Sequence, residues 1–237
     1  MAFTELNLSN SLLNALNDMG YNKPTTIQHK AFATAMSGAD VCGIAQTGTG
    51  KTIAYLLPCL RQWKFTKDIA PQILIVVPTR ELVVQVVETI NKLTTYMSVV
   101  TAGVYGGVNI NTQKLSVEKK VDIIVATPGR LFDLAMNGSL KLKAIKKLVI
   151  DEVDEMLNLG FRTQLKNILD LLPAKRQNLL FSATLTDDVE DLMQLYFTNP
   201  VKIEAAPTGT PLENIRQFGY DVPNFYTKVN LLQLLLA

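Results

Sequence analysis

Short apolar runs alternate with longer amphipathic stretches through most of the chain. Residues 73–77, 122–126, 147–150 and 178–181 are apolar with little polar alternation. Strands of this kind are buried on both faces, as in a parallel sheet covered by helices, and the stretches between them have helical length. The pattern predicts an α/β fold, a mostly parallel β-sheet sandwiched between helices.

Capping and turn residues mark the two ends of this pattern. Ser9 can cap an opening helix that Gly20 can stop. Near the other end, Pro, Gly and Thr cluster over residues 204–214, which predicts a linker. We therefore expect one main domain, residues 1–206, followed by a linker and a short remaining segment, residues 207–237.

Polar clusters follow five of the expected strands directly. "AQTGTGKT" comes after the strand ending near Ile44, and the others come after Val77, Ala126, Ile150 and Phe181: "PTREL", "TPGR", "DEVD" and "SAT". In an open parallel sheet, ligands bind outside the carboxyl ends of the strands. The five clusters should therefore converge on one edge of the sheet.

Composition and charge exclude few classes of function. The 237 residues are 48% hydrophobic with a net charge of +2, so any nucleic-acid contact must come from local placement of groups. Two cysteines, Cys42 and Cys59, and the single His29 do not make a structural metal site. The start of the chain does not resemble a signal peptide, and no apolar run has membrane-spanning length. We expect a soluble, cytoplasmic protein without a membrane contact.

Residues 45–52, "AQTGTGKT", have the pattern of a phosphate-binding P-loop. Gly48 and Gly50 let backbone N–H groups approach phosphate oxygens, Lys51 can reach the β and γ phosphates, and Thr52 can offer its hydroxyl to Mg²⁺. Ala45 replaces the glycine that usually opens the pattern. The alternative is a Gly/Thr-rich turn with an exposed lysine. The P-loop interpretation predicts ATP and Mg²⁺ as cofactors.

Four carboxylates, Asp151, Glu152, Asp154 and Glu155, lie at the tip of an expected buried strand. Carboxylates leaving a core are costly unless something positive or hydrogen-bonding meets them. We expect Asp151 to help hold Mg²⁺ and Glu152 to polarise an attacking water. The alternative is a solvated first helical turn, where acids favour the dipole; this would suit Asp154 and Glu155 alone.

With these five clusters in this order, the chain resembles the DEAD-box RNA helicases from about Phe3 to its end. The resemblance implies the N-terminal RecA-like domain of an ATP-dependent RNA helicase, with the catalytic residues Lys51, Asp151, Glu152, Ser182 and Thr184. It also implies a P-loop set that contacts the nucleotide: Gln46, Thr47, Gly48, Thr49, Gly50, Lys51 and Thr52.

The segment "GYNKPTTIQ" resembles the family's adenine-recognising segment. The resemblance implies nucleotide contacts from Tyr21, Lys23, Thr26 and Gln28. The glutamine amide both donates and accepts, so Gln28 can pair with adenine N6 and N7. Phe3 is similar in position to an aromatic that packs on the base, although it could equally be a hydrophobic staple for the first helix.

The remaining motifs resemble the family's RNA-binding elements. Each opens a helix or a glycine turn, where free N–H groups, a hydroxyl and an arginine can hold backbone phosphates. The residues implied are Pro78, Thr79, Arg80, Gly106, Gly107, Thr127, Pro128, Gly129 and Arg130. The alternative for the two arginines is an ordinary surface ion pair. RNA, as distinct from DNA, rests here on the resemblance alone.

"SAT" offers two hydroxyls, Ser182 and Thr184. In the family they hydrogen-bond the last acid of the box, here Asp154, and help couple nucleotide state to strand separation. The alternative is a helix cap. The box is spelled "DEVD", with Val153 in place of alanine, and we expect a small neighbour or a slight shift to make room for the extra methyls.

Residues 207–237 resemble the linker with only the first strand and helix of a second RecA-like domain. The arginines that such a domain supplies contribute about 10³ to 10⁵ in rate, so this polypeptide alone should bind nucleotide but be nearly inactive. Its apolar last helix could fold back on the main domain or support self-association with another copy. Two further interpretations stay open: an ATP-dependent RNA clamp or scaffold, and a P-loop phosphotransferase.

Overall fold

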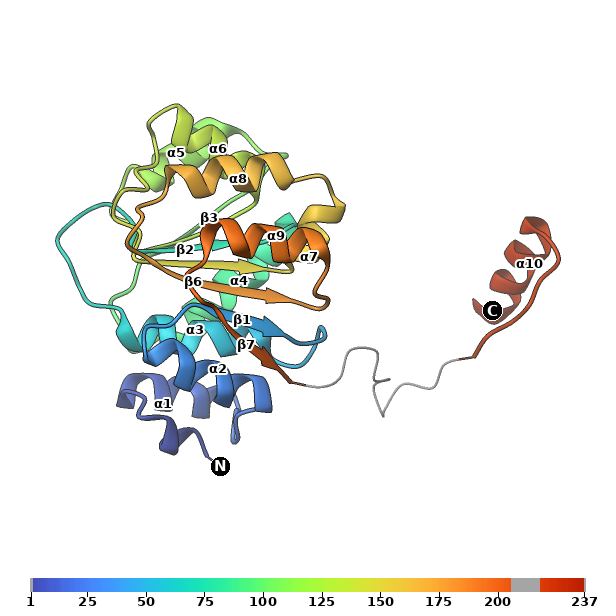
Figure 1. Ribbon diagram of the computed structural model, residues 1–237, viewed down its shortest axis with the longest axis horizontal. Helices are drawn as coiled ribbons and strands as arrows, with labels where there is room; N and C mark the ends of the chain where they lie inside the picture. Colours follow the sequence, from blue (N-terminus) through green and yellow to red (C-terminus); the bar gives the residue numbers. More distant parts are fainter. Residues whose placement is uncertain (1, 206–217, 237) are drawn as a thin grey trace.

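The computed structural model describes residues 2–205 and 218–236, and its centre is a seven-stranded parallel sheet (Figure 1). The strand order is β3-β4-β2-β5-β6-β1-β7, and neighbouring strands in this order run parallel. In chain order the strands are β1 Val41–Ile44, β2 Ile73–Val76, β3 Thr101–Val104, β4 Ile123–Ala126, β5 Lys147–Asp151, β6 Gln177–Ser182 and β7 Val201–Glu204. The predicted α/β fold is confirmed.

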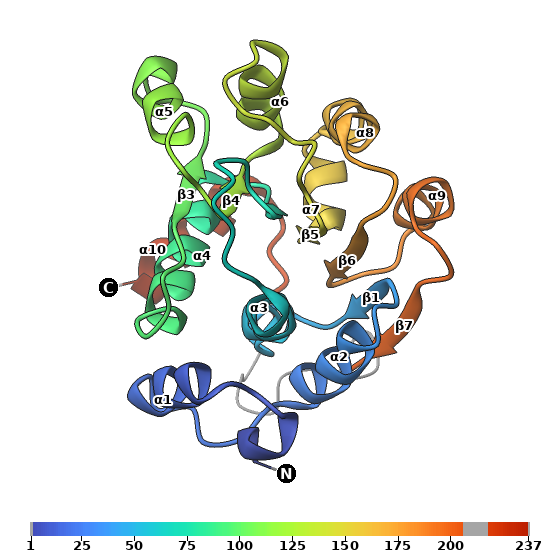
Figure 2. The same cartoon turned by 90° about the vertical axis from the view of Figure 1, so that its left-hand side faces the viewer.

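Helices cover both faces of the sheet, as the view along the strands shows (Figure 2). One face carries α1 Asn10–Asp18, α2 Thr26–Met36, α3 Lys51–Gln62 and α4 Arg80–Leu93, with the short 3-10 helix Phe3–Leu6 beside them. The other face carries α5 Ile110–Val117, α6 Pro128–Met136, α7 Val153–Asn158, α8 Arg162–Leu171 and α9 Asp187–Tyr196. Each face has its own apolar core cluster.

The strands lack polar alternation because the sheet is buried on both faces. All residues of β1, β2, β4, β5 and β6 are buried, whereas edge strand β7 buries only Ile203. The opening helix forms as predicted: the Ser9 hydroxyl accepts from the Leu12 N–H, and Gly20 adopts a left-handed φ of 75° after the helix.

A close contact inside the sheet fixes the helix that follows the P-loop. A Cβ on Gly43 would lie 2.5 Å from the ring of Phe181, so β1 needs glycine at this point. The Phe181 ring in turn packs against Tyr55 of α3, with the ring centroids 5.5 Å apart. Phe181 therefore links β6, β1 and α3 in the core directly beneath the P-loop.

The sheet order arranges the polar motifs along one edge. From β3 towards β1, the carboxyl ends lead into the glycine pair, "TPGR", "PTREL", "DEVD", "SAT" and the P-loop. The expected convergence is confirmed. The motifs that resemble RNA-binding elements follow β3, β4 and β2, and those that resemble nucleotide-binding elements follow β5 and β1. The "SAT" motif, predicted to couple the two, follows β6.

The last described element is α10 Phe225–Leu236, which Figure 1 draws apart from the sheet. It has no buried residue. Most of the predicted linker lies outside the described residues, and the division into residues 1–206 and 207–237 stays a prediction. Among the described helices, none combines the length and the apolar character needed to cross a membrane.

Candidate nucleotide and RNA site

The P-loop turns from β1 into α3 through two left-handed glycines. Gly48 has a φ of 88° and Gly50 a φ of 90°, a conformation that other residues rarely adopt. Thr49 closes the turn, because its hydroxyl donates to the Gln46 carbonyl at 2.7 Å. Lys51 is then the first residue of α3, whose free N–H groups face the loop.

Lys51 is held in an ion pair in this conformation. Its Nζ lies 2.8 Å from Oε1 of Glu152, and its side chain is only 5% exposed. The Thr47 hydroxyl also donates to that carboxylate, at 3.4 Å. An exposed lysine on a simple turn is therefore the wrong interpretation. Glu152 is the anion that faces Lys51 in this conformation.

Asp151 is a buried carboxylate beside this pair. Burial raises its pKa to about 6, against the lowering effect of the nearby Lys51 charge. Its Oδ1 accepts from the Glu152 N–H at 3.0 Å. The Tyr55 hydroxyl lies in the core beside Asp151 and Thr52, and burial followed by the Asp151 charge raises the pKa of Tyr55. Burial of the Asp151 carboxylate therefore outweighs the Lys51 charge and the hydrogen bonds that lower its pKa.

The backbone at Glu152 separates the roles of the acids. Glu152 has φ 52° and ψ 48°, a left-handed conformation that costs a non-glycine residue roughly 1 kcal/mol or more. It joins the end of β5 to the start of α7. Because of this turn, Glu152 meets Lys51 of α3 while Asp154 meets the neighbouring strand, β6.

Asp154 contacts "SAT" as the resemblance implies. Its Oδ2 accepts from the Thr184 hydroxyl at 2.7 Å and from the Thr184 N–H at 3.0 Å. Burial alone would raise the pKa of Asp154, but the bonds from Thr184 and the nearby Ser182 hydroxyl outweigh it and leave that pKa below its usual value. The Ser182 hydroxyl itself is buried without a hydrogen-bond partner of good geometry among the described residues, so of the two predicted bonds to Asp154 only that of Thr184 forms. The helix-cap alternative for Thr184 is wrong, because α9 is capped by Thr186.

Val153 lies between these acids and is fully buried in the core cluster on the α7 face. The two contacts on either side of it, Lys51–Glu152 and Asp154–Thr184, are both present. The extra methyls of valine are therefore compatible with both pairings.

Gln28 contacts the P-loop from α2. Its Oε1 accepts from the Thr25 N–H at 2.9 Å, and its Nε2 donates to the Gly50 carbonyl at 3.2 Å. The Thr25 hydroxyl donates to the Thr49 carbonyl at 3.0 Å. The Gln28 amide thus already uses one donor and one acceptor, and recognition of adenine stays a prediction that requires its remaining groups or a rearrangement.

The other predicted nucleotide contacts divide into buried and exposed side chains. Phe3 is 4% exposed and belongs to the core, so the packing alternative describes this conformation. Tyr21, Lys23 and Thr26 are exposed and come at or just before the start of α2. Their roles stay predictions.

The predicted RNA motifs open α4 and α6. The Thr79 hydroxyl caps α4 by accepting from the Leu82 N–H at 3.3 Å, whereas Thr127 makes no side-chain cap bond at α6, whose first residue is Pro128. Gly107, with φ 80°, is required by its turn, and a Cβ on Gly106, Gly107 or Gly129 would meet no atom within 4 Å. These positions are open surface.

Neither arginine of these motifs is in an ordinary surface ion pair, so that alternative is wrong. Arg80 lies over the ring of Tyr105, 5.1 Å from its centroid. Arg130 donates to Oε1 of Gln113 at 2.6 Å and to the Val108 carbonyl at 2.9 Å. Within residues 2–205 and 218–236, neither makes a salt bridge. Both positive charges are therefore available to an anion.

Sequence reasoning missed three residues of this site. Tyr55 lies inside an apolar helical run, so nothing in the sequence distinguishes it from core. Gln113, which positions Arg130, lies in a segment without a motif. Of the three, Thr25 was the easiest to predict from the sequence, since Thr25 and Gln28 have the spacing of a capping box.

Comparison with known proteins gives a consistent result. Residues 25–192 match the family model described as DEAD/DEAH box helicase. The chain is 40% identical to the DEAD-box ATP-dependent RNA helicase 28 of Oryza sativa subsp. japonica, over 87% of this chain and 26% of that protein. It is 40% identical to the DEAD-box ATP-dependent RNA helicase CshA of Bacillus cereus, over 93% of this chain and 42% of that protein.

A solved structure shares the fold. The crystal structure of a DEAD box protein from the hyperthermophile Methanococcus jannaschii superimposes with a TM-score of 0.83 at 36% identity, over 87% of this chain and 56% of that one. The chain thus spans less than half the length of the two relatives named above. The family model covers well over half of the chain, and the motif contacts described above lie largely within it. This chain belongs to the DEAD/DEAH box helicase family.

Proposed function

We propose that this chain is the ATP-binding, N-terminal RecA-like domain of an ATP-dependent RNA helicase, residues 1–206, followed by the linker and the start of a second such domain, residues 207–237. The observation that carries the proposal is the ion pair between Lys51 and Glu152, 2.8 Å, which brings the P-loop lysine and the "DEVD" glutamate together from opposite sides of β6. That geometry supports a nucleotide site with its hydrolytic carboxylate in place.

The donor groups fit Mg²⁺ bound together with phosphates. Asp151 is a buried carboxylate with a raised pKa, and a cation beside it would relieve the cost of its burial. The Thr52 hydroxyl is the second donor. The described parts of the chain hold no group of three or more His, Cys, Asp or Glu side chains able to bind a metal. This suits Mg²⁺, which takes its remaining ligands from phosphates and water.

In the proposed reaction, Lys51 leaves Glu152 and pairs with the β and γ phosphates, while the P-loop N–H groups hold their oxygens. Bound Mg²⁺ would neutralise charge that develops on those oxygens. Glu152, released from Lys51, then orients water against the γ phosphate and accepts its proton. Gln28 pairs with the adenine base.

RNA would bind along the β3, β4 and β2 end of the same edge. Arg80, Arg130 and the open backbone at Gly106, Gly107 and Gly129 offer contacts that suit a sugar-phosphate strand without regard to sequence. Asp154, Ser182 and Thr184 join the ends of β5 and β6, between the two ligands. Their contact is suited to transmit the state of the nucleotide to the RNA.

Nucleotide titration tests the proposal directly. The chain should bind ATP with Mg²⁺, Lys51→Ala should weaken binding at least about tenfold, and single-stranded RNA should tighten it. Lys166→Ala, an exposed lysine of α8, is the control. Unchanged ATP affinity in Lys51→Ala would overturn the nucleotide site, and no effect of RNA would favour a phosphotransferase.

Strand separation belongs to the whole protein. In a duplex-displacement assay the full-length protein should separate a short RNA duplex in the presence of ATP. Binding without displacement would favour an RNA clamp or scaffold instead.

A further inference from the structure

A basic surface lies at the edge of the sheet opposite the nucleotide and RNA site. It is formed by the four connections that lead into neighbouring strands β4, β2, β5 and β6: residues 118–122, 63–72, 137–146 and 172–176. These connections hold nine lysines and arginines against three acids, a net of +6, whereas the whole chain carries +2 and the remaining residues therefore sum to −4. Positive charge is thus concentrated away from the predicted RNA motifs.

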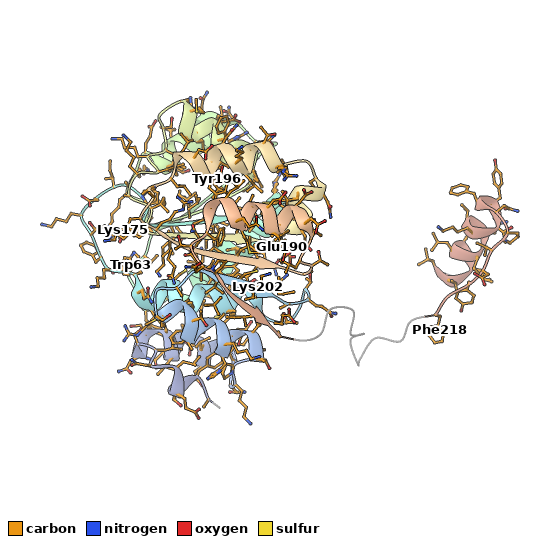
Figure 3. All side chains as sticks on the ribbon, viewed as in Figure 1. Trp63, Lys175, Glu190, Tyr196, Lys202 and Phe218 are labelled. Atoms are coloured by element: carbon orange, nitrogen blue, oxygen red, sulfur yellow. The ribbon has the colours of Figure 1, made fainter. Side chains whose placement is uncertain are left out.

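Figure 2 looks onto this edge, and Figure 3 labels Lys175 and Trp63 at the left-hand side of the molecule. β7 ends at Glu204 on the other edge, so the chain leaves the domain on the side away from this surface. No described segment that follows the domain needs to cross it.

The surface is hollowed and apolar at its centre. A cavity of about 580 Å³, here called the amino-edge hollow, is lined by Ala70, Ala135, Gly138, Leu140, Lys141, Leu142, Lys143, Ala144 and Leu171. Two smaller hollows of about 200 and 180 Å³ adjoin it and share several lining residues, Ala70 among them. Leu171 and neighbouring Met136 expose 41% and 63% of their surface. Such a concave aliphatic surface is typical of a site that receives a side chain of a partner.

Four lysines rim these hollows: Lys141, Lys143, Lys146 and Lys175. All four are exposed, and within the described parts of the chain none has a salt-bridge partner. Lys146 donates only to the Gln72 amide oxygen, at 2.9 Å. Asp68 and Glu118 also line the smaller hollows, so the rim keeps a surplus of positive charge.

We propose that the amino-edge hollow docks an acidic peptide segment of a partner protein. One aliphatic or aromatic side chain of the segment sits in the hollow, and carboxylates before and after it pair with the lysine rim. The apolar floor and the basic rim together favour a peptide that has both an apolar side chain and carboxylates beside it. The electrostatic complementarity of the rim contributes mainly to specificity and to the association rate.

Two other occupants fit the surface less well. RNA is held by stacking on aromatic or arginine side chains. Trp63, Phe65 and Arg176 belong to this surface, but none of them lines the hollow, which offers alanines, leucines, a glycine and lysines. The chain's own α10 is apolar but has no carboxylate and carries Lys228, so the rim would not favour it.

A binding experiment on the full chain tests the proposal. The probe is a short fluorescein-labelled peptide of Glu and Asp around a central Leu-Phe pair, measured by anisotropy at about 0.1 M salt. It should bind, and replacing Leu-Phe by Ser-Ser, or the acids by lysines, should weaken binding at least about tenfold. Equal binding of all three peptides would overturn the proposal.

Charge-reversed variants locate the site. The double variant Lys141→Glu/Lys143→Glu should lower the affinity for the acidic peptide about tenfold. The control Lys166→Glu/Lys228→Glu changes the net charge equally, at two exposed lysines elsewhere, and should change that affinity by less than about twofold. Circular dichroism checks that both variants are folded. Equal effects of the two pairs would refute the assignment.

Two further outcomes would reassign the surface. Displacement of the peptide by oligo(U) RNA, with loss of RNA binding in Lys141→Glu/Lys143→Glu, would make it an RNA site. Concentration-dependent self-association that the same variant abolishes would make it a contact between copies of this chain. Either result overturns the acidic-peptide proposal while leaving the ATP site unaffected.

Discussion

At the scale of single residues, the ion pair between Lys51 and Glu152 has two consequences. It gives a buried ammonium an opposite charge at 2.8 Å, although the Lys51 Nζ makes no hydrogen bond of good geometry to a described residue, and it competes with the phosphate that Lys51 is proposed to bind. Nucleotide binding must therefore break one electrostatic contact in order to form another.

Glu152→Gln should accordingly bind ATP more tightly than the unmodified chain. The substitution frees Lys51 and removes a negative charge beside the triphosphate, and we expect a gain of about fivefold in affinity. Equilibrium titration with a fluorescent ATP analogue measures it. Glu155→Gln, exposed in the same helix, should change affinity little. Weaker binding by Glu152→Gln would contradict the competition.

The bond between Thr184 and Asp154 predicts a pH-dependent stability. Because the pKa of Asp154 is lower in the folded state, its contribution is present above its unfolded value, near 3.8, and is lost as the pH falls through the lower folded value. Thr184→Val should therefore lose about 1 kcal/mol at pH 7, and this loss should shrink as the pH falls below 3.8 through the folded pKa of Asp154. Urea unfolding at several pH values measures the difference.

Thr186→Val is the matched control for that experiment. Thr186 is two residues along and caps α9 without a side-chain hydrogen bond, so its stability loss should be small and independent of pH. If the stability loss of Thr184→Val did not depend on pH, the Thr184 hydrogen bond would not be linked to the protonation of Asp154, and the prediction would be wrong.

Motif residues were predictable because their chemistry requires particular side chains at fixed spacing. Gly48, Gly50, Lys51 and Asp151 are of this kind. Tyr55 was not predictable, because its position reads as core and its hydroxyl gains importance only when β5 brings Asp151 beside it. The same holds for the contact between Gln28 and Gly50, which depends on the packing of α2 against α3.

At the scale of elements, α4 and α6 begin alike in sequence but differently in structure. Both start after a threonine at a strand end, yet only Thr79 caps its helix with its hydroxyl. The Thr127 hydroxyl makes no cap bond to α6.

Thr79→Ala should therefore cost about 1 kcal/mol in stability, and Thr127→Ala clearly less. If both hydroxyls also contact RNA phosphates, the two variants should lose RNA affinity to a similar extent. Thermal unfolding and RNA titration, run on both, separate the effects. Equal stability losses would show that the cap bond at Thr79 contributes nothing.

Five of the seven strands were predicted, and the strand order was not. The strands without a prediction, β3 and β7, are the partly buried edge strands, which lack a continuous apolar run. Continuous apolar runs indicate buried strands, but the position of β6 between β5 and β1 depends on contacts far apart in the chain, such as Phe181 against Gly43. This order explains why the Thr184 hydroxyl of "SAT" meets Asp154 of the "DEVD" box.

At the scale of the whole molecule, α10 exposes a large apolar surface. Leu234 and Leu236 expose 74% and 79% of their surface, and no residue of the helix is buried. Exposed apolar patches of this kind favour association.

We expect the polypeptide of residues 1–237 to associate as its concentration rises, and Leu234→Glu to reduce this. Leu195→Glu, at a 69% exposed leucine of α9, is the control. Sedimentation velocity over a concentration series, with and without residues 230–237, measures the effect. Association that persists without those residues would assign it to another surface.

Hydrolysis belongs to this scale too. The polypeptide of residues 1–237 should bind ATP but hydrolyse it slowly, since the arginines that a second RecA-like domain supplies contribute about 10³ to 10⁵ to the rate. Phosphate release with and without RNA measures it. Robust RNA-stimulated turnover by residues 1–237 would contradict this expectation.

The uneven distribution of charge gives the molecule an electric polarity along its strands, with +6 gathered at the entry connections to four strands and −4 distributed over the remainder. On a negatively charged support the molecule should adsorb in one orientation, with the carboxyl ends of the strands pointing into solution. A biosensor chip coated with carboxylate would then present the nucleotide site uniformly, with no affinity tag required.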